Sequence, residues 1–199
     1  SVLIVLLSWF SILGAKPPNI VLIFTDDQGY NDLGCFGSQK IKTPHLDRMA
    51  EEGLVLTSFY AQPVCGVSRA ALMTGSYPIR VAEPNNLKRL HTVPHPKETT
   101  IPEVLKKVGY ATGMIGKWHL ALDRKDLPTG VGPATMPNAQ GFDYFYGTPR
   151  FNGYTVLVND TKMRSPIMRN QEMVVESVES WDNITADYTR EAIAWIKAN

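Results

Sequence analysis

The sequence lacks an excess of charge of either sign. Lys and Arg together number 20, Asp and Glu number 19, and the formal net charge is +1. A chain this balanced does not attract nucleic acid or an acidic membrane through its overall charge, so we expect neither as a partner. Recognition of an anion must come from individually placed side chains. Because 44% of the residues are hydrophobic, the chain is able to bury a core as one domain or as part of a larger one.

Long apolar runs are also scarce. The run at the start, residues 1–15 (SVLIVLLSWFSILGA), carries no charge and is too short to span a bilayer comfortably. We interpret it as the apolar part of a signal peptide whose basic start is missing, with a buried first strand or helix as the alternative. The small residues at its end, where a signal peptide would be cleaved, include no cysteine that could carry a lipid anchor. We therefore expect an exported protein, periplasmic or extracellular (lysosomal or secretory in a eukaryote), without a stable membrane anchor.

Cysteine occurs only twice, as Cys35 and Cys65. The two could form one disulfide in an oxidising compartment, or could be thiols with separate fates. Cys65 stands in the stretch PVCGVSRAALMTG, just before a short helix expected over 68–74. Backbone N–H groups and the dipole at a helix N-terminus favour an anion and lower the pKa of a thiol. Arg69 adds a fixed charge able to grip an oxyanion with two N–H groups.

Strand-like and helix-like segments alternate along the chain. Residues 19–25 (NIVLIFT) form an apolar, β-branched run that predicts a strand buried on both faces, and 54–61 and 110–115 predict two more. Between and after them, capping residues and apolar periodicity predict helices over 44–52, 100–108 and 187–197. Residues 122–140, rich in Pro and Gly, predict an irregular surface loop. The alternation indicates an α/β layered fold, in which ligands bind beyond the carboxyl ends of the strands.

Two further groups of polar residues follow predicted strands. Asp26 and Asp27 come after the first strand, where a turn would let both carboxylates face one hard cation such as Ca²⁺ or Mg²⁺; the alternative is an acidic surface turn. Lys117 and His119 come after the strand ending near 115 and project the same way from an extended segment. In a functional site the lysine would supply a cation and the histidine would carry a proton. The alternative is structural, with the lysine stem lying along apolar surface and the histidine buried in the core. With Cys65, these groups could share one site.

Several separate blocks resemble the amino-terminal half of the sulfatase family, nearest in style to arylsulfatase A-like members. In order and spacing they are PNIVLIFTDDQGYNDLGCFG, TPHLDRMAEEG, CGVSRAALMTG, GYATGMIGKWHL and GFDYFYG, and the match runs from about Pro18 to the end of the chain. The resemblance implies an alkaline-phosphatase-like, three-layer α/β/α sandwich with a mostly parallel central sheet. Because the family's later blocks do not occur in this sequence, we expect residues 18–199 to be the amino-terminal part of the catalytic domain.

The resemblance also implies a chemistry. Cys65 would be oxidised to formylglycine by a maturation system, and the hydrated aldehyde would attack the sulfur of a sulfate ester, in a small molecule or a sulfated glycan. Asp26, Asp27 and the modified Cys65 match metal-binding positions, usually for Ca²⁺, with Mg²⁺ as the alternative. Arg69 would hold the nucleophile and the developing charge. Lys117 and His119 match the pair that orients the hydrate, with His119 as the base in the elimination step.

One departure from the family pattern is Val67, where the family usually has Pro two residues after the cysteine. This difference weakens the signal read by the maturation enzyme. Two other functions are compatible with the residues. One is a phosphodiesterase or phosphonate hydrolase of the same superfamily that uses the same modified residue. The other is an inactive binding relative in which Cys65 stays a thiol or pairs with Cys35.

Overall fold

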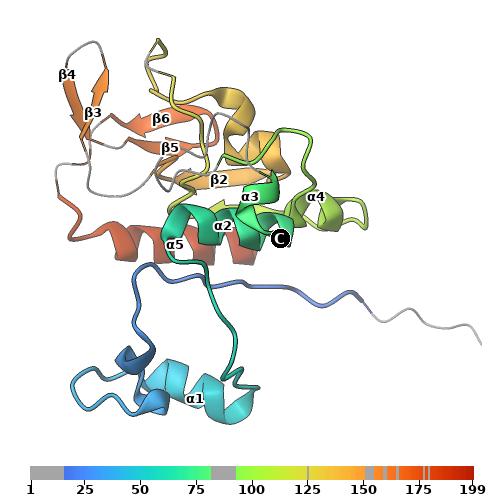
Figure 1. Ribbon diagram of the computed structural model, residues 1–199, viewed down its shortest axis with the longest axis vertical. Helices are drawn as coiled ribbons and strands as arrows, with labels where there is room; N and C mark the ends of the chain where they lie inside the picture. Colours follow the sequence, from blue (N-terminus) through green and yellow to red (C-terminus); the bar gives the residue numbers. More distant parts are fainter. Residues whose placement is uncertain are drawn as a thin grey trace, which may run out of the picture. The chain divides into compact units, whose positions relative to one another are not determined.

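The structure, a computed structural model, describes residues 16–81, 93–124, 126–150, 155–158, 161–164, 166–176, 178 and 180–199. The predicted signal segment, residues 1–15, lies outside the described residues. The chain divides into two compact units, one ending at Gly53 and the other running from Leu54 to Asn199. Figure 1 draws both, and each is described by itself. No helix in the described part of the chain combines the length and the apolar character that a membrane crossing requires.

The first unit is built around one helix. Two short 3₁₀ turns, η1 (Tyr30–Asp32) and η2 (Gly34–Phe36), precede α1 (Pro44–Glu52), which begins after Thr43 and ends before Gly53 as predicted. The Thr43 hydroxyl does not cap the helix, however. It accepts the N–H of Gly34 at 2.8 Å and donates to Asp47 Oδ1 at 2.9 Å. The Thr43 hydroxyl therefore holds the η2 turn against the start of α1 and does not satisfy the free N–H groups of the helix.

The predicted strand over 19–25 is wrong. This segment is irregular, forms no ladder within the described residues, and leaves Ile20 to Ile23 more than half exposed. The prediction over 54–61 is wrong for the same reason, since Leu54 and Phe59 are also exposed and the segment contains only a turn. A β-branched composition favours an extended chain, but a strand exists only where a neighbour satisfies its backbone groups.

The second unit contains a four-stranded sheet in the order β1-β2-β5-β6. Its strands are β1 (Gly113–Ile115), β2 (Tyr144–Gly147), β5 (Ile167–Arg169) and β6 (Glu172–Val175). Only β1 and β2 pair in parallel, while β2–β5 and β5–β6 are antiparallel. A separate hairpin joins β3 (Thr155–Val158) to β4 (Thr161–Arg164). The α/β class is confirmed, but the sheet in the described residues is mixed rather than mostly parallel. A tight turn at Asn170, with φ of 54°, reverses the chain after β5 and so makes β5 and β6 antiparallel.

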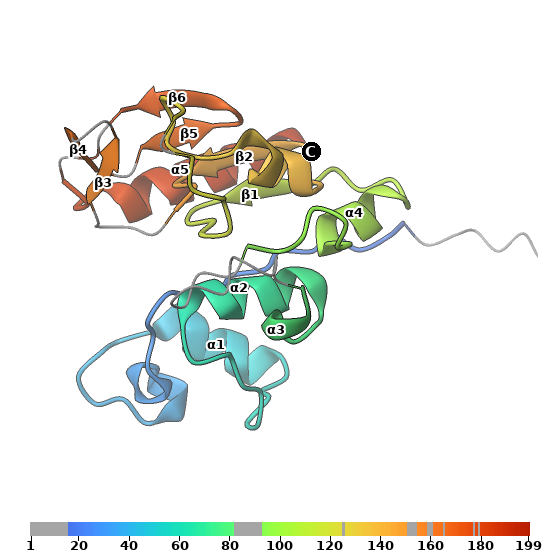
Figure 2. The same ribbon diagram turned by 45° about the horizontal axis from the view of Figure 1, so that its top comes forward.

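The described residues of the second unit also form the helices α2 (Cys65–Thr74), α3 (Pro78–Val81), α4 (Ile101–Lys106) and α5 (Ile184–Ala198). The capping box predicted for α4 is confirmed, because the Thr100 N–H donates to Glu103 Oε2 at 2.8 Å. Helix α5 lies against β1 and β2, as Figures 1 and 2 show. Helix α2 begins three residues earlier than predicted, which makes Cys65 its first residue.

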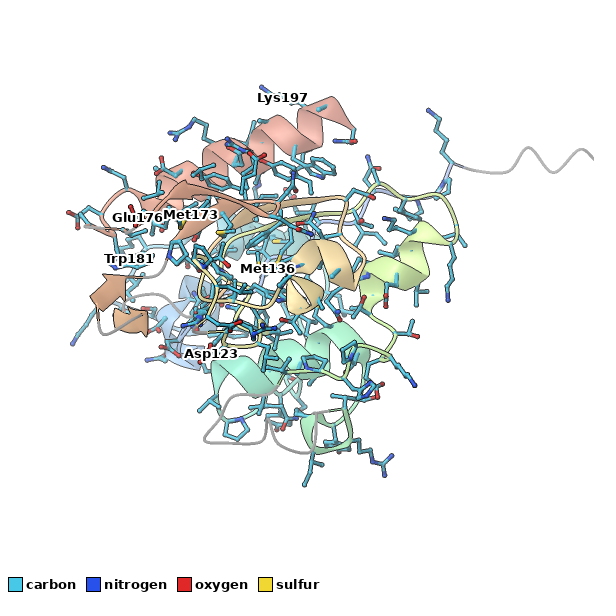
Figure 3. All side chains as sticks on the ribbon, turned by 90° about the horizontal axis from the view of Figure 1, so that it is seen from above. Asp123, Met136, Met173, Glu176, Trp181 and Lys197 are labelled. Carbon is cyan, nitrogen blue, oxygen red and sulfur yellow. The ribbon has the colours of Figure 1, made fainter. Side chains whose placement is uncertain are left out.

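The segment 122–140 is only in part the surface loop that its Pro and Gly content predicted, because residues 130–132 and 135–137 are buried. It contains η3 (Pro133–Thr135) and η4 (Pro137–Gln140), and Val131 and Met136 are each only 2% exposed. Trp118 Nε1 donates to the carbonyl oxygen of Thr135 at 2.9 Å. In Figure 3 Met136 lies among the other side chains, whereas Lys197 at the end of α5 points outward. The prolines and glycines therefore shape an irregular layer of the core.

A buried arginine, paired with a partly exposed aspartate, fixes this layer to the chain that follows β2. Arg150 Nη2 lies 2.9 Å from Asp123 Oδ1, and the same guanidinium donates to the carbonyl oxygen of Gly130. The Arg150 side chain is only 4% exposed, and its burial lowers its pKa while the charge of Asp123 raises it. The Asp123 side chain is 56% exposed, so the cost of breaking the pair falls on the buried guanidinium, which would lose its charged partner if 123–130 moved away from Arg150.

We predict that Gly147→Ala destabilises the protein by about 3 kcal/mol or more. Gly147 has φ of 152°, and a Cβ there would collide with the backbone carbonyl of Gly116. The matched control is Gly75→Ala. Gly75 also has positive φ (64°) but has open space around it, so only the conformational cost of about 1 kcal/mol applies. Urea denaturation of the two variants measures the difference, and equal losses would contradict the proposed collision.

Candidate active site

Cys65 opens α2 and faces a histidine. Its Sγ lies 3.3 Å from His119 Nδ1, and both side chains are at least partly buried. The residue before it, Val64, is extended (φ −145°, ψ 164°) and supplies no side-chain cap. The first N–H groups of α2 have no partner within the helix, so an anionic group next to Cys65 would meet both these donors and the imidazole.

Backbone pairing carries His119 to this position. Beyond the β1–β2 ladder, the N–H groups of Gly116, Trp118 and His119 donate to the carbonyl oxygens of Tyr146, Thr148 and Pro149, at 2.8, 2.9 and 3.1 Å. At His119 the chain then turns into the left-handed region, with φ of 62°. Such a conformation is uncommon for a residue other than glycine and persists only where surrounding contacts hold it. The segment therefore leaves the predicted extended conformation at His119, whose side chain is 6% exposed.

Arg69 joins the helix to the same segment. It lies four residues after Cys65 in α2, so the two side chains share one face of the helix. Its Nη1 donates to the carbonyl oxygen of Lys117 at 2.6 Å. The four residues predicted to be catalytic thus come together through two contacts, Cys65 with His119 and Arg69 with Lys117. Their roles in a reaction stay predictions.

The predicted metal ligands lie in different units. Asp26 and Asp27 belong to the first unit, where the chain bends after residue 25 and Asp27 takes a φ of 52°. The predicted turn is therefore present. Within the described residues, no three or more His, Cys, Asp or Glu side chains form a group able to hold a metal. The donor chemistry fits in part, because two carboxylates suit Ca²⁺ whereas an unmodified thiol at 65 does not.

Both cysteines are free thiols in the structure. Cys35 is exposed in the first unit, where its N–H donates to Asp47 Oδ1 at 2.7 Å. Cys65 is partly buried and contacts His119.

Sequence reasoning gave Ser68 no role of its own, and the structure assigns it one. Its hydroxyl donates to the carbonyl oxygen of Gln62 at 3.0 Å, and the side chain is buried. This bond fixes the loop that leads into α2, and so fixes the direction in which Cys65 leaves the helix. The sequence did contain a signal for this bond, because a serine in the first turn of a helix readily bonds a nearby backbone group.

The family model described as Sulfatase matches residues 18–199. N-acetylgalactosamine-6-sulfatase of Mus musculus is 38% identical over 98% of this chain and 40% of its own length. Arylsulfatase A of Homo sapiens is 47% identical over 68% of this chain and 26% of its own length. The chain thus spans about two fifths, or less, of the length of these curated relatives.

Solved structures agree with the sequence comparison. The crystal structure of Ps i-CgsB has a TM-score of 0.71 and 32% identity, and it covers 91% of this chain and 41% of its own. The PsFucS1 sulfatase from Pseudoalteromonas sp. has a TM-score of 0.67 and 28% identity, and it covers 87% of this chain and 39% of its own. The fold is therefore α/β, of the alkaline-phosphatase-like kind. The chain belongs to the sulfatase family.

We predict that Ser68→Ala lowers the free energy of unfolding by about 1 kcal/mol, because the Gln62 carbonyl loses its donor while alanine returns part of the loss through helix propensity. Ser76→Ala is the matched control. Its hydroxyl contacts the Thr74 carbonyl at 3.5 Å, too long for a strong bond, so little change is expected. Urea denaturation measures both variants. A Ser68→Ala protein as stable as the unmodified one would show that the loop does not depend on this bond.

Proposed function

We propose that the protein containing this chain hydrolyses sulfate esters. The observation that carries the proposal is the 3.3 Å contact between Cys65 Sγ and His119 Nδ1 at the start of α2, in a chain of the sulfatase family. The 2.6 Å bond from Arg69 to the Lys117 carbonyl supports it, because it holds a fixed cation on the helix face that carries Cys65. Relatives that are named sulfatases over most of this chain support it further.

In this proposal Cys65 acts after conversion to formylglycine by a maturation system. A thiolate is a soft ligand and mismatches a hard cation, whereas an oxygen at the same position suits one. The hydrated formylglycine supplies an oxygen nucleophile for the sulfur of the ester. The other residues of the site bind, orient and exchange protons around that position.

His119 handles the proton. An imidazole within hydrogen-bond distance of the side chain at 65 is placed to take a proton from it or return one near neutral pH. Burial and the backbone bond to Pro149 limit the movement of this residue. A ring held in this way meets the geometric requirement for general acid–base catalysis before any question of its pKa arises.

Arg69 and Lys117 supply positive charge. The guanidinium of Arg69 is held by the backbone of the segment that follows β1, so it needs little reorganisation when charge develops on a bound sulfuryl group. The Lys117 ammonium adds a compact point charge from the same segment. Fixed cations of this kind stabilise an oxyanion more than mobile ones do.

Asp26 and Asp27, together with an oxygen of the modified residue 65, would hold a divalent cation, Ca²⁺ in the first instance and Mg²⁺ as the alternative. Their carboxylates are the hard oxygen donors that these ions prefer. The ion would supply Lewis acidity at the sulfuryl oxygens.

For the substrate we propose a sulfated glycan, or a smaller sulfate ester. The relative from Mus musculus is named N-acetylgalactosamine-6-sulfatase. A second similar structure is that of Ps i-CgsB in complex with k-i-k-neocarrahexaose. That neighbour has a TM-score of 0.64 and 29% identity. Export, proposed from the apolar segment 1–15, would bring the protein to extracellular or lysosomal glycans.

We predict that Cys65→Ala lowers the release of sulfate from an aryl sulfate at least about a thousandfold in the full-length protein made with the maturation enzyme. Cys35→Ala is the matched control, because this exposed thiol has no part in the proposed chemistry. Peptide mass spectrometry of the protein without substitutions should find formylglycine at residue 65 and cysteine at residue 35. Full turnover by Cys65→Ala would exclude the nucleophile, and faster hydrolysis of an aryl phosphate than of the aryl sulfate would favour the phosphoester reaction.

We predict that Val67→Pro raises the fraction of formylglycine at residue 65 without unfolding α2. Val67 is the third residue of the helix, and its N–H belongs to the first turn, where no backbone partner within the helix is lost to proline. Mass spectrometry of the Cys65 peptide measures the fraction, and circular dichroism checks the helix content. A fraction no higher than that of the unmodified sequence would show that Val67 does not limit maturation.

A further inference from the structure

Arg150 is a buried arginine next to the site that the proposed chemistry leaves unused. It follows Pro149, whose carbonyl oxygen accepts the N–H of His119 at 3.1 Å. Both Pro149 and Arg150 are buried, and the proline ring fixes the backbone just before the arginine. The guanidinium therefore extends from a rigid stretch that is already bonded to the backbone of His119.

The Arg150 guanidinium joins both arms of one narrow turn. Its Nη2 lies 2.9 Å from Asp123 Oδ1 and also donates to the carbonyl oxygen of Gly130. Asp123 and Val131 face each other in an isolated antiparallel bridge, so the two acceptors belong to neighbouring arms of the turn. The buried Nε has no hydrogen-bond partner among the described residues. Within that part of the chain, these two contacts hold the head group.

Two tethers hold the chain over 119–123 against 149–150. One is the backbone bond from His119, and the other is the side-chain pair of Asp123 with Arg150. The two residues directly after His119 are each 1% exposed and belong to the apolar core. Apolar packing is non-directional, so it keeps these residues inside without fixing their position along the chain. The two tethers supply that fixed position.

His119 is the residue that needs such support. Its φ of 62° lies in the left-handed region, which costs a residue other than glycine about 1 kcal/mol or more and persists only where surrounding contacts hold it. A relaxation of this angle would redirect the imidazole, whose Nδ1 lies 3.3 Å from Cys65 Sγ. A contact of that length tolerates little displacement, because hydrogen bonds weaken steeply with distance and angle.

We propose that Arg150 and Asp123 are positioning residues for His119: they hold the chain on its carboxyl side, so that the imidazole keeps its place beside residue 65. This inference rests on the proposed function of the same site. An arginine suits the task because its planar head group presents several N–H donors and can bond both arms of the turn at once.

The test is Arg150→Met and, separately, Asp123→Ala in the full-length, matured protein. Methionine fills the buried space without a charge, while Asp123→Ala disturbs the tether at its 56% exposed end, where less stability is at risk. We expect kcat for an aryl sulfate to fall about tenfold in Arg150→Met and about fivefold in Asp123→Ala, where the Gly130 carbonyl still holds the guanidinium. KM should stay within about twofold, because a displaced proton carrier slows the chemical step more than it weakens binding.

Two further measurements separate positioning from a general loss of structure. In a His119→Ala background, neither substitution should lower kcat further, because residues that act through one another are not additive. The NMR signals of the His119 ring, identified by their loss in His119→Ala, should shift in both Arg150→Met and Asp123→Ala.

Asp126→Ala is the matched control. Asp126 lies in the same turn, and its carboxylate pairs with Arg124 at 2.6 and 2.8 Å on the exposed surface. Breaking this pair leaves the tether between Asp123 and Arg150 in place. We therefore expect kcat, KM and the His119 signals to equal those of the protein without substitutions. In every variant kcat is expressed per formylglycine at residue 65.

Four results would overturn the inference: an unchanged kcat in Asp123→Ala, a loss carried by KM instead of kcat, equal losses with and without His119, or His119 signals that stay in place. If Arg150→Met does not fold, Asp123→Ala decides alone. A failure of the proposed function looks different, because the protein without substitutions would then release no sulfate. In that case the NMR comparison still decides whether the tether positions His119.

Discussion

Backbone hydrogen bonds between the chain after β1 and the chain after β2 position most of the candidate site. They place Lys117 and His119 next to α2, and they need Gly147, because a Cβ there would collide with the backbone of Gly116. The contacts from Arg69 to the Lys117 carbonyl and from Cys65 to His119 both depend on this pairing. A displacement of the segment would therefore alter the surroundings of the proposed nucleophile and of the fixed cation together.

Sequence patterns predicted local structure where a short-range interaction decides it. The capping box at Thr100 and the start of α1 after Thr43 follow from residues within one helical turn, and both were found. Lys117 and His119 do follow a strand, β1, which pairs in parallel with β2, whereas their part in binding a ligand stays a prediction. Composition failed where the outcome depends on distant partners. Residues 19–25 look like a buried strand but have no ladder in the described residues, and the proline-rich 122–140 is buried in part, at 130–132 and 135–137, rather than exposed throughout.

The site shows the same division. Cys65 and Arg69 are found from one motif, because four residues span one turn of a helix. Tyr188 lies in the helix predicted over 187–197, and nothing in its own neighbourhood of sequence connects it to Gly116. Only the packing of α5 on β1 and β2 makes that connection. Asp26 and Asp27 mark the opposite case, in which the motif is clear and their placement with Cys65 stays a prediction.

The buried irregular layer over 122–140 has a consequence for how such a protein diversifies. Loops at an enzyme surface accept insertions and deletions freely, but a loop whose Val131 and Met136 fill the interior does not. Libraries that seek new substrate preference in this scaffold should leave this stretch at its native length. Changes of reach and shape are better sought in exposed connections elsewhere in the chain.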